Sequence, residues 1–291
     1  MHVRAVAAAT TALLGATVLL LPTSAAHAAA AADADNPLVV AHRGASAYAP
    51  ENTLAAVDKA DEMGFEWVEN DVQRTRDGRL VVLHDATLTR TTNVEELYPE
   101  RAPWNVADFT AAEIARLDAG SWFGDDYAGA RVPTLEQYMR RVSRNHQKLV
   151  LEIKNPQLYP GIEQETLKVL GNEGWLGPAR IEDLVIQSFG ADTVRRVHEL
   201  RPAVKTAVLG TPDIADLPEY ATFSDQINSS YTTISASYVA TIHALEGPHG
   251  KPLEMLTWTV NDAANARRVA DYGVNGIITN KPDVVREATQ G

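Results

Sequence analysis

The feature that most constrains this fold is an alternation of short, continuously apolar runs with longer amphipathic stretches. The runs are rich in β-branched residues and mostly lack apolar–polar alternation, as expected for strands that are covered on both faces. The predicted strands span 38–41, 67–72, 80–83, 149–153, 184–187, 204–209, 255–260 and 276–279. Helical patterns are found at 53–63, 135–145, 162–172, 191–200, 238–245 and 263–271. The pattern therefore predicts an α/β protein built on a parallel sheet.

Eight predicted strands with helices between most of them indicate a TIM-type (β/α)₈ barrel over residues 37–291. An open, doubly wound sheet is the alternative, but no Gly-x-Gly-x-x-Gly follows the first predicted strand. Residues 86–133 contain no clear strand, and a connection of that length is usually functional or has structure of its own. We therefore predict a small inserted subdomain after the third strand, lying over the mouth of the barrel. We expect Asn52 to cap the first helix, and Asp262 or Asn261 to cap the last.

The N-terminus has the pattern of a targeting segment. Arg4 precedes an apolar run at 5–21, and Ala26-His27-Ala28 fits the small-x-small cleavage pattern. This predicts a secretory signal peptide over 1–28, a disordered leader over 29–36 and a secreted, extracellular protein. The Ala-rich run is marginal as a membrane span, so a retained anchor is the alternative and we expect no stable membrane insertion.

The bulk composition narrows the classes of partner and chemistry. The formal net charge is −12, which gives no general attraction to nucleic acid or to an anionic membrane. A chain this acidic that handles phosphate needs local positive charge from a few basic residues or a metal ion. The absence of cysteine excludes disulfides, thiolate catalysis and zinc–thiolate sites.

Carboxylates gather near the ends of two predicted strands. Glu69 and Asp71 are two residues apart in one strand, and Glu152 and Lys154 are two apart in another, so each pair faces one way. The carboxyl ends of barrel strands converge on one face, where three carboxylates would repel and would be costly to desolvate. A bound cation resolves both problems, and oxygen ligands favour Mg²⁺, Ca²⁺ or Mn²⁺. The alternative is a set of salt bridges to Arg43 and Lys154.

Two histidines stand at the ends of predicted strands, His42 at the first and His84 at the third. A lone histidine is most often structural, but this pair could reach one substrate. Phosphodiester cleavage needs a base for the nucleophile and an acid for the leaving alkoxide, and histidine can serve as either near neutral pH. Arg43 adds a planar donor fork for phosphate oxygens, and Lys154 adds a point charge.

Two further residues have open roles. Glu51 could orient Arg43, bind the metal, or lie on the surface as an ordinary acid. Trp258 could stack on the glycerol or leaving group of a substrate, or it could be a core aromatic.

A set of short motifs extends over nearly all of the chain that follows the predicted leader. They are His42-Arg43-Gly44, Pro50-Glu51-Asn52-Thr53, Glu69-Asn70-Asp71-Val72, 75–78 leading to 80–85, 120–123, 132–135, Leu151-Glu152-Ile153-Lys154, 187–189, Trp258-Thr259-Val260-Asn261 and 276–283. In this order they resemble the glycerophosphodiester phosphodiesterase family. Each motif is weak alone, but together they are highly specific.

The resemblance implies a TIM barrel with an inserted subdomain and hydrolysis of glycerophosphodiesters to sn-glycerol 3-phosphate and an alcohol. It implies that His42 and His84 are the acid–base pair. It also implies that Glu69, Asp71 and Glu152 bind one Ca²⁺ or Mg²⁺ ion, and that Arg43 and Lys154 hold the phosphate. It leaves open which histidine is the base. The alcohol also stays open: choline, ethanolamine, inositol, glycerol or a wall teichoic acid unit.

The sequence departs from the family pattern at Asn280, where the last strand's motif often has Asp. We expect this change to affect local bonding more than chemistry. The region 221–237 is also hard to align. The sequence disfavours two rival functions. The lack of cysteine and the 151–154 motif disfavour a phospholipase D-like toxin enzyme, and the complete set of histidines and carboxylates disfavours a catalytically dead head-group-binding barrel.

Overall fold

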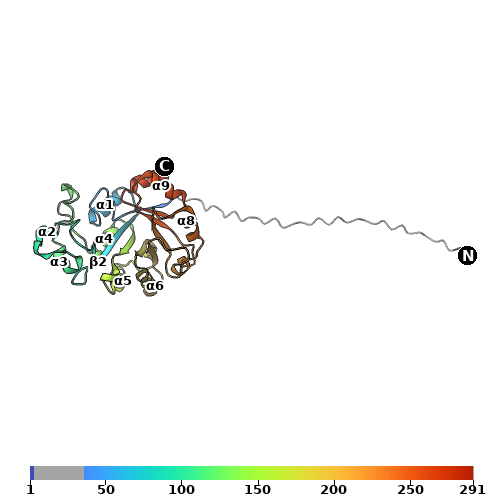
Figure 1. Cartoon of the computed structure of the whole chain (residues 1–291), viewed down its shortest axis with the longest axis horizontal. Coiled ribbons are helices and arrows are strands. Elements are labelled where there is room, and N and C mark those ends of the chain that lie inside the picture. The colour runs from blue at the N-terminus through green and yellow to red at the C-terminus, as the bar shows by residue number, and fades with distance from the viewer. Residues whose placement is uncertain (3–35, 291) are drawn as a thin grey trace. The chain divides into compact units, whose positions relative to one another are not determined.

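Parallel strands close into a barrel, and helices between them cover its outside (Figure 1). The computed structural model describes residues 1–2 and 36–290, so nearly all of the predicted signal peptide and of the leader lies outside the described residues. Within 36–290 eight strands form the barrel, which closes through the pairing of β1 with both β2 and β9. They are β1 Leu38–Ala41, β2 Trp67–Arg74, β4 Lys148–Ile153, β5 Leu184–Ser188, β6 Lys205–Leu209, β7 Gln226–Ser230, β8 Leu256–Trp258 and β9 Gly276–Thr279. The predicted TIM barrel is confirmed.

Most helices lie in the connections between consecutive barrel strands. They are α1 Leu54–Glu62, α4 Leu135–Arg144, α5 Ile162–Asn172, α6 Ala191–Leu200, α7 Leu217–Tyr220, α8 Ala236–His243 and α9 Ala263–Asp271, with α10 Pro282–Gln290 after β9. The connection from β4 to β5 also contains two short 3₁₀ turns, η4 Pro156–Leu158 and η5 Ile181–Asp183. Among the helices of residues 36–290, none has the length and apolarity needed to cross a membrane.

The barrel has eight strands, as predicted, but one of the eight predicted segments is not a barrel strand. Leu80–Val82 forms β3, which pairs antiparallel with the far end of β2 and lies outside the barrel. The missing barrel strand is β7, in the region that was hard to align. Its inward-facing Gln226 and Asn228 are polar, so it has no continuous apolar run. Asn228 Nδ2 donates to Gln187 Oε1 at 3.0 Å, which satisfies this polar layer inside the barrel.

Residues 86–133 form a series of short helices and turns between β3 and α4. They are α2 Val94–Leu97, η1 Pro99–Arg101, η2 Val106–Asp108, α3 Ala111–Ile114 and η3 Asp125–Tyr127, and Figure 1 shows α2 and α3 at the edge of the barrel. The segment packs around a hydrophobic cluster that includes its Phe109, Ile114 and Leu117 and also Val81 of β3 and the adjoining Leu83. Tyr127 Oη donates to the Tyr48 carbonyl at 2.7 Å, which ties the segment to the loop after β1.

Strand parity decides which side chains enter the barrel. Val40, Val150 and Val185 belong to a small cluster inside it, whereas their neighbours Val39 and Leu151 pack outward in the main core against the helices. Side chains two residues beyond an inward position also face inward. The residues two positions after these valines, at the carboxyl ends of β1, β4 and β5, therefore line the barrel mouth. They are His42, Glu152 and Gln187.

The helix caps correct one prediction. Thr53, not Asn52, caps α1, because its side chain accepts the backbone N–H three residues later. Asn52 instead adopts φ 59° and donates its side-chain amide to Asp71 Oδ2 at 2.8 Å. Asp262 caps α9, whereas Asn261 bonds to the end of β9. Both asparagines therefore serve the strand ends rather than the helices.

Candidate active site

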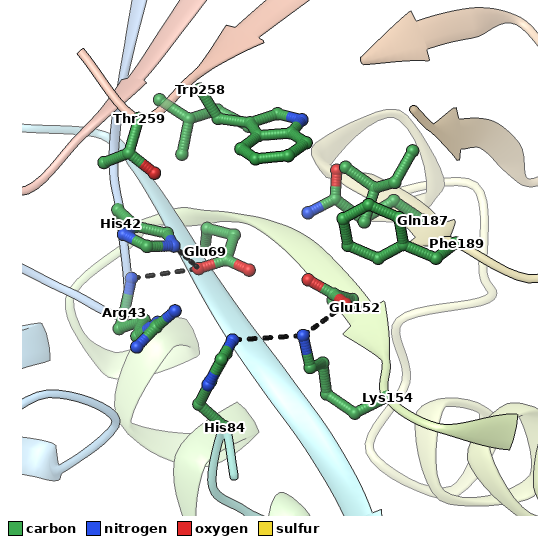
Figure 2. Close-up of a pocket in the computed structure, with 12 residues that line it drawn as sticks. His42, Arg43, Glu69, His84, Glu152, Lys154, Gln187, Phe189, Trp258 and Thr259 are labelled. Carbon is green, nitrogen blue, oxygen red and sulfur yellow. Dashed lines mark hydrogen bonds and ion pairs between the residues drawn. The ribbon is translucent and has the colours of Figure 1, made fainter. Parts of the chain in front are cut away.

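The turn after β1 directs two side chains into the barrel mouth. Arg43 and Gly44 have φ values of 57° and 78°, and the Gly44 amide bonds back to the Ala41 carbonyl. A Cβ atom at Gly44 would lie 2.5 Å from the backbone carbonyl carbon of Ala56 in α1. Only glycine fits a left-handed conformation this close to another backbone. The glycine of the His-Arg-Gly motif is therefore a local requirement of this turn, and the turn places His42 and Arg43 at the mouth (Figure 2).

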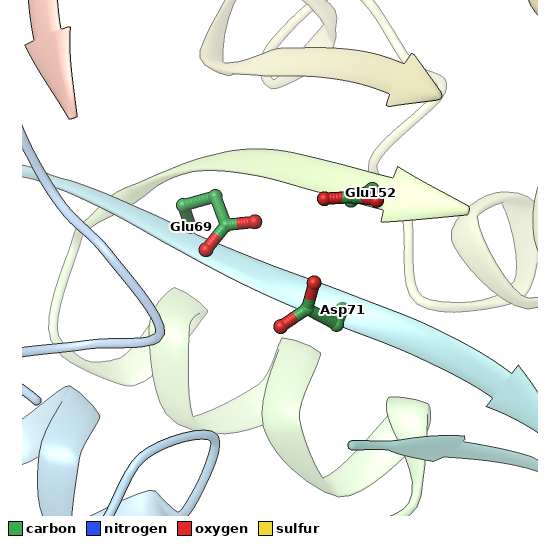
Figure 3. A group of neighbouring side chains, drawn as sticks. All are labelled: Glu69, Asp71 and Glu152. Carbon is green, nitrogen blue, oxygen red and sulfur yellow. The ribbon is translucent and has the colours of Figure 1, made fainter. Parts of the chain in front are cut away.

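Three carboxylates meet at the mouth, as the strand parity predicts. Glu69 and Asp71 come from β2 and Glu152 from β4, where Asp71 and Glu152 are paired in register (Figure 3). Their ligand oxygens lie within 4.8 Å of one another, and all three side chains are buried. Asp71 Oδ1 is buried without a hydrogen-bond partner. Three clustered oxygen donors, one of them unsatisfied, fit a hard divalent cation.

The negative charges of the three carboxylates are not fully balanced by the nearby cations, as the pKa values of the two glutamates show. Burial, together with repulsion from its carboxylate neighbours, raises the pKa of Glu69 well above its usual value. Burial and the charge of Asp71 raise the pKa of Glu152 to about 8. Burial opposes ionisation of Asp71 as well, but the charge of Arg43 and its other cationic neighbours outweighs this and lowers its pKa. A bound cation would offset both the cost of burying the two glutamate charges and the repulsion between the carboxylates.

Arg43 and Lys154 supply the positive charge of the site. Arg43 Nε lies 3.3 Å from Asp71 Oδ2, and its backbone N–H donates to Glu69 Oε2 at 3.0 Å. Lys154 Nζ lies 2.9 Å from Glu152 Oε1 and 3.8 Å from Asp71 Oδ1. The salt bridges considered as an alternative to a metal site are thus present. They still leave Asp71 Oδ1 without a hydrogen bond, so they do not replace a cation.

His42 is held by the residue that departs from the family pattern. Its Nδ1 lies 2.6 Å from Asn280 Oδ1, so an Nδ1–H can donate to the amide oxygen. Nε2 lies 3.9 Å from Glu69 Oε2. Burial, followed by the charge of Arg43, lowers the pKa of His42 to about 4. His42 is therefore a neutral imidazole near pH 7, with the lone pair of Nε2 available.

His84 reaches the site by a route that differs from the predicted one. It does not follow a barrel strand, because β3 runs antiparallel to β2 and carries the chain back to the level of Asp71. Gln73, from β2, fixes this return by donating its side-chain amide to the carbonyl oxygens of Leu83 and His84. His84 Nδ1 lies 2.7 Å from Asp85 Oδ1, and Nε2 lies 3.1 Å from Lys154 Nζ.

One pocket, open to solvent, is lined by six of these residues: His42, Arg43, Glu69, His84, Glu152 and Lys154. Figure 2 shows His42, His84 and Lys154 around it, with the aromatic side chains Trp258 and Phe189 on its remaining side. The ring of Phe189 adjoins the charged groups, since Lys154 Nζ lies 5.6 Å from its centroid. The rings of Trp258 and Phe189 meet edge to face at 5.6 Å, and Trp258 Nε1 donates to the Asn228 carbonyl. The pocket therefore has a charged side and an aromatic side.

The sequence pattern of the glycerophosphoryl diester phosphodiesterase family matches residues 42–284, and thus nearly all of the barrel. The chain belongs to this family. This enzyme is 35% identical over 288 residues to a glycerophosphodiester phosphodiesterase of Bacillus subtilis, with 94% of this chain and 93% of the relative covered. It is 35% identical to one of Caldanaerobacter subterraneus, with 85% and 96% covered. The family resemblance of the sequence is confirmed.

A solved relative carries a bound product. It is an Oleispira antarctica phosphodiesterase in complex with sn-glycerol-3-phosphate. The two chains share 27% identity and a TM-score of 0.76, with 88% of the present enzyme and 98% of the relative covered.

Sequence reasoning missed several residues of the enzyme's site. Phe189 lines the pocket and is 55% exposed. Gln73 lies inside the barrel, and Arg90 lies in the 86–133 segment and bonds to Glu51 and Asp85. Glu51, whose role was open, accepts from Arg43 Nη1 at 2.8 Å and lies outside the carboxylate trio. The parity of β2 could have revealed Gln73, but no local pattern points to Arg90.

Proposed function

We propose that the enzyme hydrolyses glycerophosphodiesters to sn-glycerol 3-phosphate and an alcohol, with one divalent cation, Ca²⁺ or Mg²⁺. The observation that carries the proposal is a pocket lined by His42, His84, Glu69 and Glu152, with the buried Asp71 completing the carboxylate trio behind them. The product bound to the Oleispira relative supports the same substrate class.

The cation would be held by Glu69, Asp71 and Glu152, whose oxygens already lie within 4.8 Å of one another. When bound, it supplies positive charge that offsets the charge developing on the phosphoryl oxygens. The chain's own cations assist this. Arg43 and Lys154 border the trio and can bind the remaining phosphate oxygens, Arg43 with two N–H groups and Lys154 with one.

The histidines divide the proton transfers. His42, uncharged near neutral pH, takes the proton of the attacking hydroxyl through Nε2, while Asn280 holds its Nδ1–H. His84, anchored through Nδ1 by Asp85, gives a proton to the leaving alkoxide through Nε2, which is free to carry that proton once Lys154 Nζ, 3.1 Å away, turns to the phosphate. Bond formation to phosphorus and loss of the alkoxide then leave His42 protonated and His84 neutral. The attacking hydroxyl belongs either to water or to the substrate's own glycerol. Attack by the glycerol hydroxyl would give a cyclic phosphodiester, which water then opens to sn-glycerol 3-phosphate with His42 as the acid and His84 as the base.

The aromatic wall suits the uncharged carbon atoms of the substrate. Trp258 is half-buried and held by its indole N–H, so its ring faces the pocket as a fixed surface. Phe189 extends this surface toward solvent. We propose that Trp258 packs against the glycerol or the leaving group. A wall teichoic acid substrate has no support from the comparisons and is not part of the proposal.

We also propose secretion, on the N-terminal sequence pattern alone. Expression of the full chain in a secreting bacterial host, followed by N-terminal sequencing of the medium fraction, tests it. The expected N-terminus is at residue 29. A full-length chain retained in the membrane fraction would instead support the anchor.

The activity test is a screen of glycerophosphocholine, glycerophosphoethanolamine, glycerophosphoinositol and glycerophosphoglycerol, with release of sn-glycerol 3-phosphate as the readout. We expect EDTA to abolish turnover and Ca²⁺ or Mg²⁺ to restore it. His42→Ala and His84→Ala should each lose about 10²- to 10⁴-fold in kcat. His146→Ala is the matched control, because that imidazole is exposed beyond α4. Turnover of none of the four, or full activity of both site variants, would refute the proposal; turnover of sphingomyelin alone would favour the toxin-like rival.

A further inference from the structure

One side chain of the 86–133 segment, Arg90, is linked to two residues of the pocket, Arg43 and His84. Arg90 lies beyond His84 in the loop that follows β3. Its guanidinium donates to both oxygens of Glu51, from Nη1 at 2.9 Å and from Nη2 at 2.7 Å. It also donates to both oxygens of Asp85, from Nε at 2.6 Å and from Nη2 at 3.1 Å. Two carboxylates from distant parts of the chain are thus held by one planar group.

Each of these carboxylates holds a residue that faces the pocket. Glu51 accepts from Arg43 Nη1 at 2.8 Å, and Asp85 Oδ1 lies 2.7 Å from His84 Nδ1. Neither Glu51 nor Arg90 lines the pocket itself. Arg90 therefore contacts the pocket only through intermediates, by one path that ends at Arg43 and another that ends at His84.

We propose that Arg90 is a positioning residue that fixes the phosphate-binding Arg43 and the acid–base His84 in one relative geometry. This inference rests on the proposed function. Its physical basis is the guanidinium fork, whose N–H groups lie in one plane and here bind two carboxylates at once. A lysine ammonium in this place could not span both carboxylates with the same four bonds, so lysine is not an adequate replacement.

A purely structural role is the competing explanation, because Arg90 also ties the 86–133 segment to the barrel. The segment offers a matched control for that role. Arg101 has similar bonding, with donors to Glu113 at 2.7 Å and to the Asp108 carbonyl at 2.6 Å, and it stacks 3.8 Å from the centroid of Phe109. Its removal should disturb the segment without touching either path to the pocket.

The experiment compares Arg90→Ala, Arg90→Lys and Arg101→Ala with the wild type in the glycerophosphodiester assay. The readouts are kcat, KM and the folded fraction from circular dichroism. Added guanidinium, kept far below denaturing concentrations, tests chemical rescue, because the Arg90 side chain is 43% exposed and its place is open to solvent. A double variant with Asp85→Asn tests whether the effect passes through Asp85.

We expect Arg90→Ala to lower kcat about 10- to 100-fold with a much smaller change in KM, because misplaced groups act mainly on the transition state. Guanidinium should restore part of that loss, and Arg90→Lys should remain low. Added to Asp85→Asn, Arg90→Ala should cost less than it does alone. Arg101→Ala should keep its kcat per folded molecule.

A wild-type kcat in Arg90→Ala, or full activity of Arg90→Lys, would overturn the inference. It would also be overturned if the activity lost by the Arg90 and Arg101 variants matched their unfolded fractions. If Arg90→Ala fails to fold, Arg90→Lys decides the matter by the same criterion. A wild type that turns over no glycerophosphodiester refutes the proposed function instead, so the two failures are distinguishable.

Discussion

Substitution of Glu152 by Gln should change the stability of the protein in opposite directions with and without a divalent cation. The side chain is buried, within 4.8 Å of two other carboxylates. Two unit charges at that separation repel by roughly 3–4 kcal/mol at an effective dielectric constant of about 20. Arg43 and Lys154 offset part of this repulsion. The substitution keeps the shape of the side chain and removes its charge.

The pKa of Glu152 sets the pH window of the effect. Burial, followed by repulsion from Asp71, raises it from 4.5 to about 8. A carboxyl group with a raised folded-state pKa is most stabilising when protonated, so its contribution falls as pH rises from 4.5 toward 8. At pH 8 without metal, the full shift would destabilise the wild type by several kcal/mol. Allowing for the lost Lys154 contact, we expect Glu152→Gln to be about 2 kcal/mol more stable.

A bound cation reverses the sign. At a cation concentration of about 100 times Kd, the wild type gains about 2.7 kcal/mol by mass action, whereas the variant lacks one ligand and gains far less. For a domain of this size each kcal/mol shifts Tm by about 2–4 °C. The variant should therefore melt several degrees above the wild type in EDTA at pH 8 and below it in saturating Ca²⁺ or Mg²⁺.

Differential scanning calorimetry of both proteins in EDTA and in each cation measures the effect. Glu173→Gln is the control, because Glu173 forms an ion pair with the exposed Arg140, and its Tm should differ little in either condition. A variant that melts below the wild type in EDTA at pH 8 would refute the repulsion argument. A wild-type Tm that no divalent cation raises would refute the metal site.

Three further predictions concern single residues, each measured by urea unfolding unless stated. Burial would raise the pKa of Asp118, but four hydrogen bonds within its own loop outweigh this and lower the pKa to about 2. Asp118→Ala should therefore lower the free energy of unfolding by about 1 kcal/mol at pH 7. This contribution is present above pH 3.8 and is lost as pH falls toward 2. Asn70 is buried with both amide atoms unpaired, so Asn70→Leu should raise the free energy of unfolding by about 1–3 kcal/mol; a loss would show that the amide is satisfied. Asn52→Ala, which removes a donor to Asp71, should lower kcat about tenfold, whereas Thr53→Ala should cost about 1 kcal/mol in stability and leave kcat unchanged.

The sequence alone determined most of the barrel and the centre of the site. Continuous apolar runs fix strands that are covered on both faces, and this periodicity is local. Parity within β2 and β4 is local too, so the inward direction of Glu69, Asp71 and Glu152 followed once the barrel was inferred. The turn that needs Gly44 is likewise contained in a short motif.

Only the tertiary structure decided how those pieces meet. A polar strand such as β7 has no apolar signal, because its inward Asn228 bonds to Gln187 of β5 inside the barrel. β3 resembles a barrel strand in the sequence, and only its antiparallel pairing with β2 shows that it is not one. The contacts His42–Asn280 and Arg90–Glu51 join residues 238 and 39 positions apart. Such contacts depend on where the closed barrel brings distant loops, and neither periodicity nor motif spacing encodes that distance.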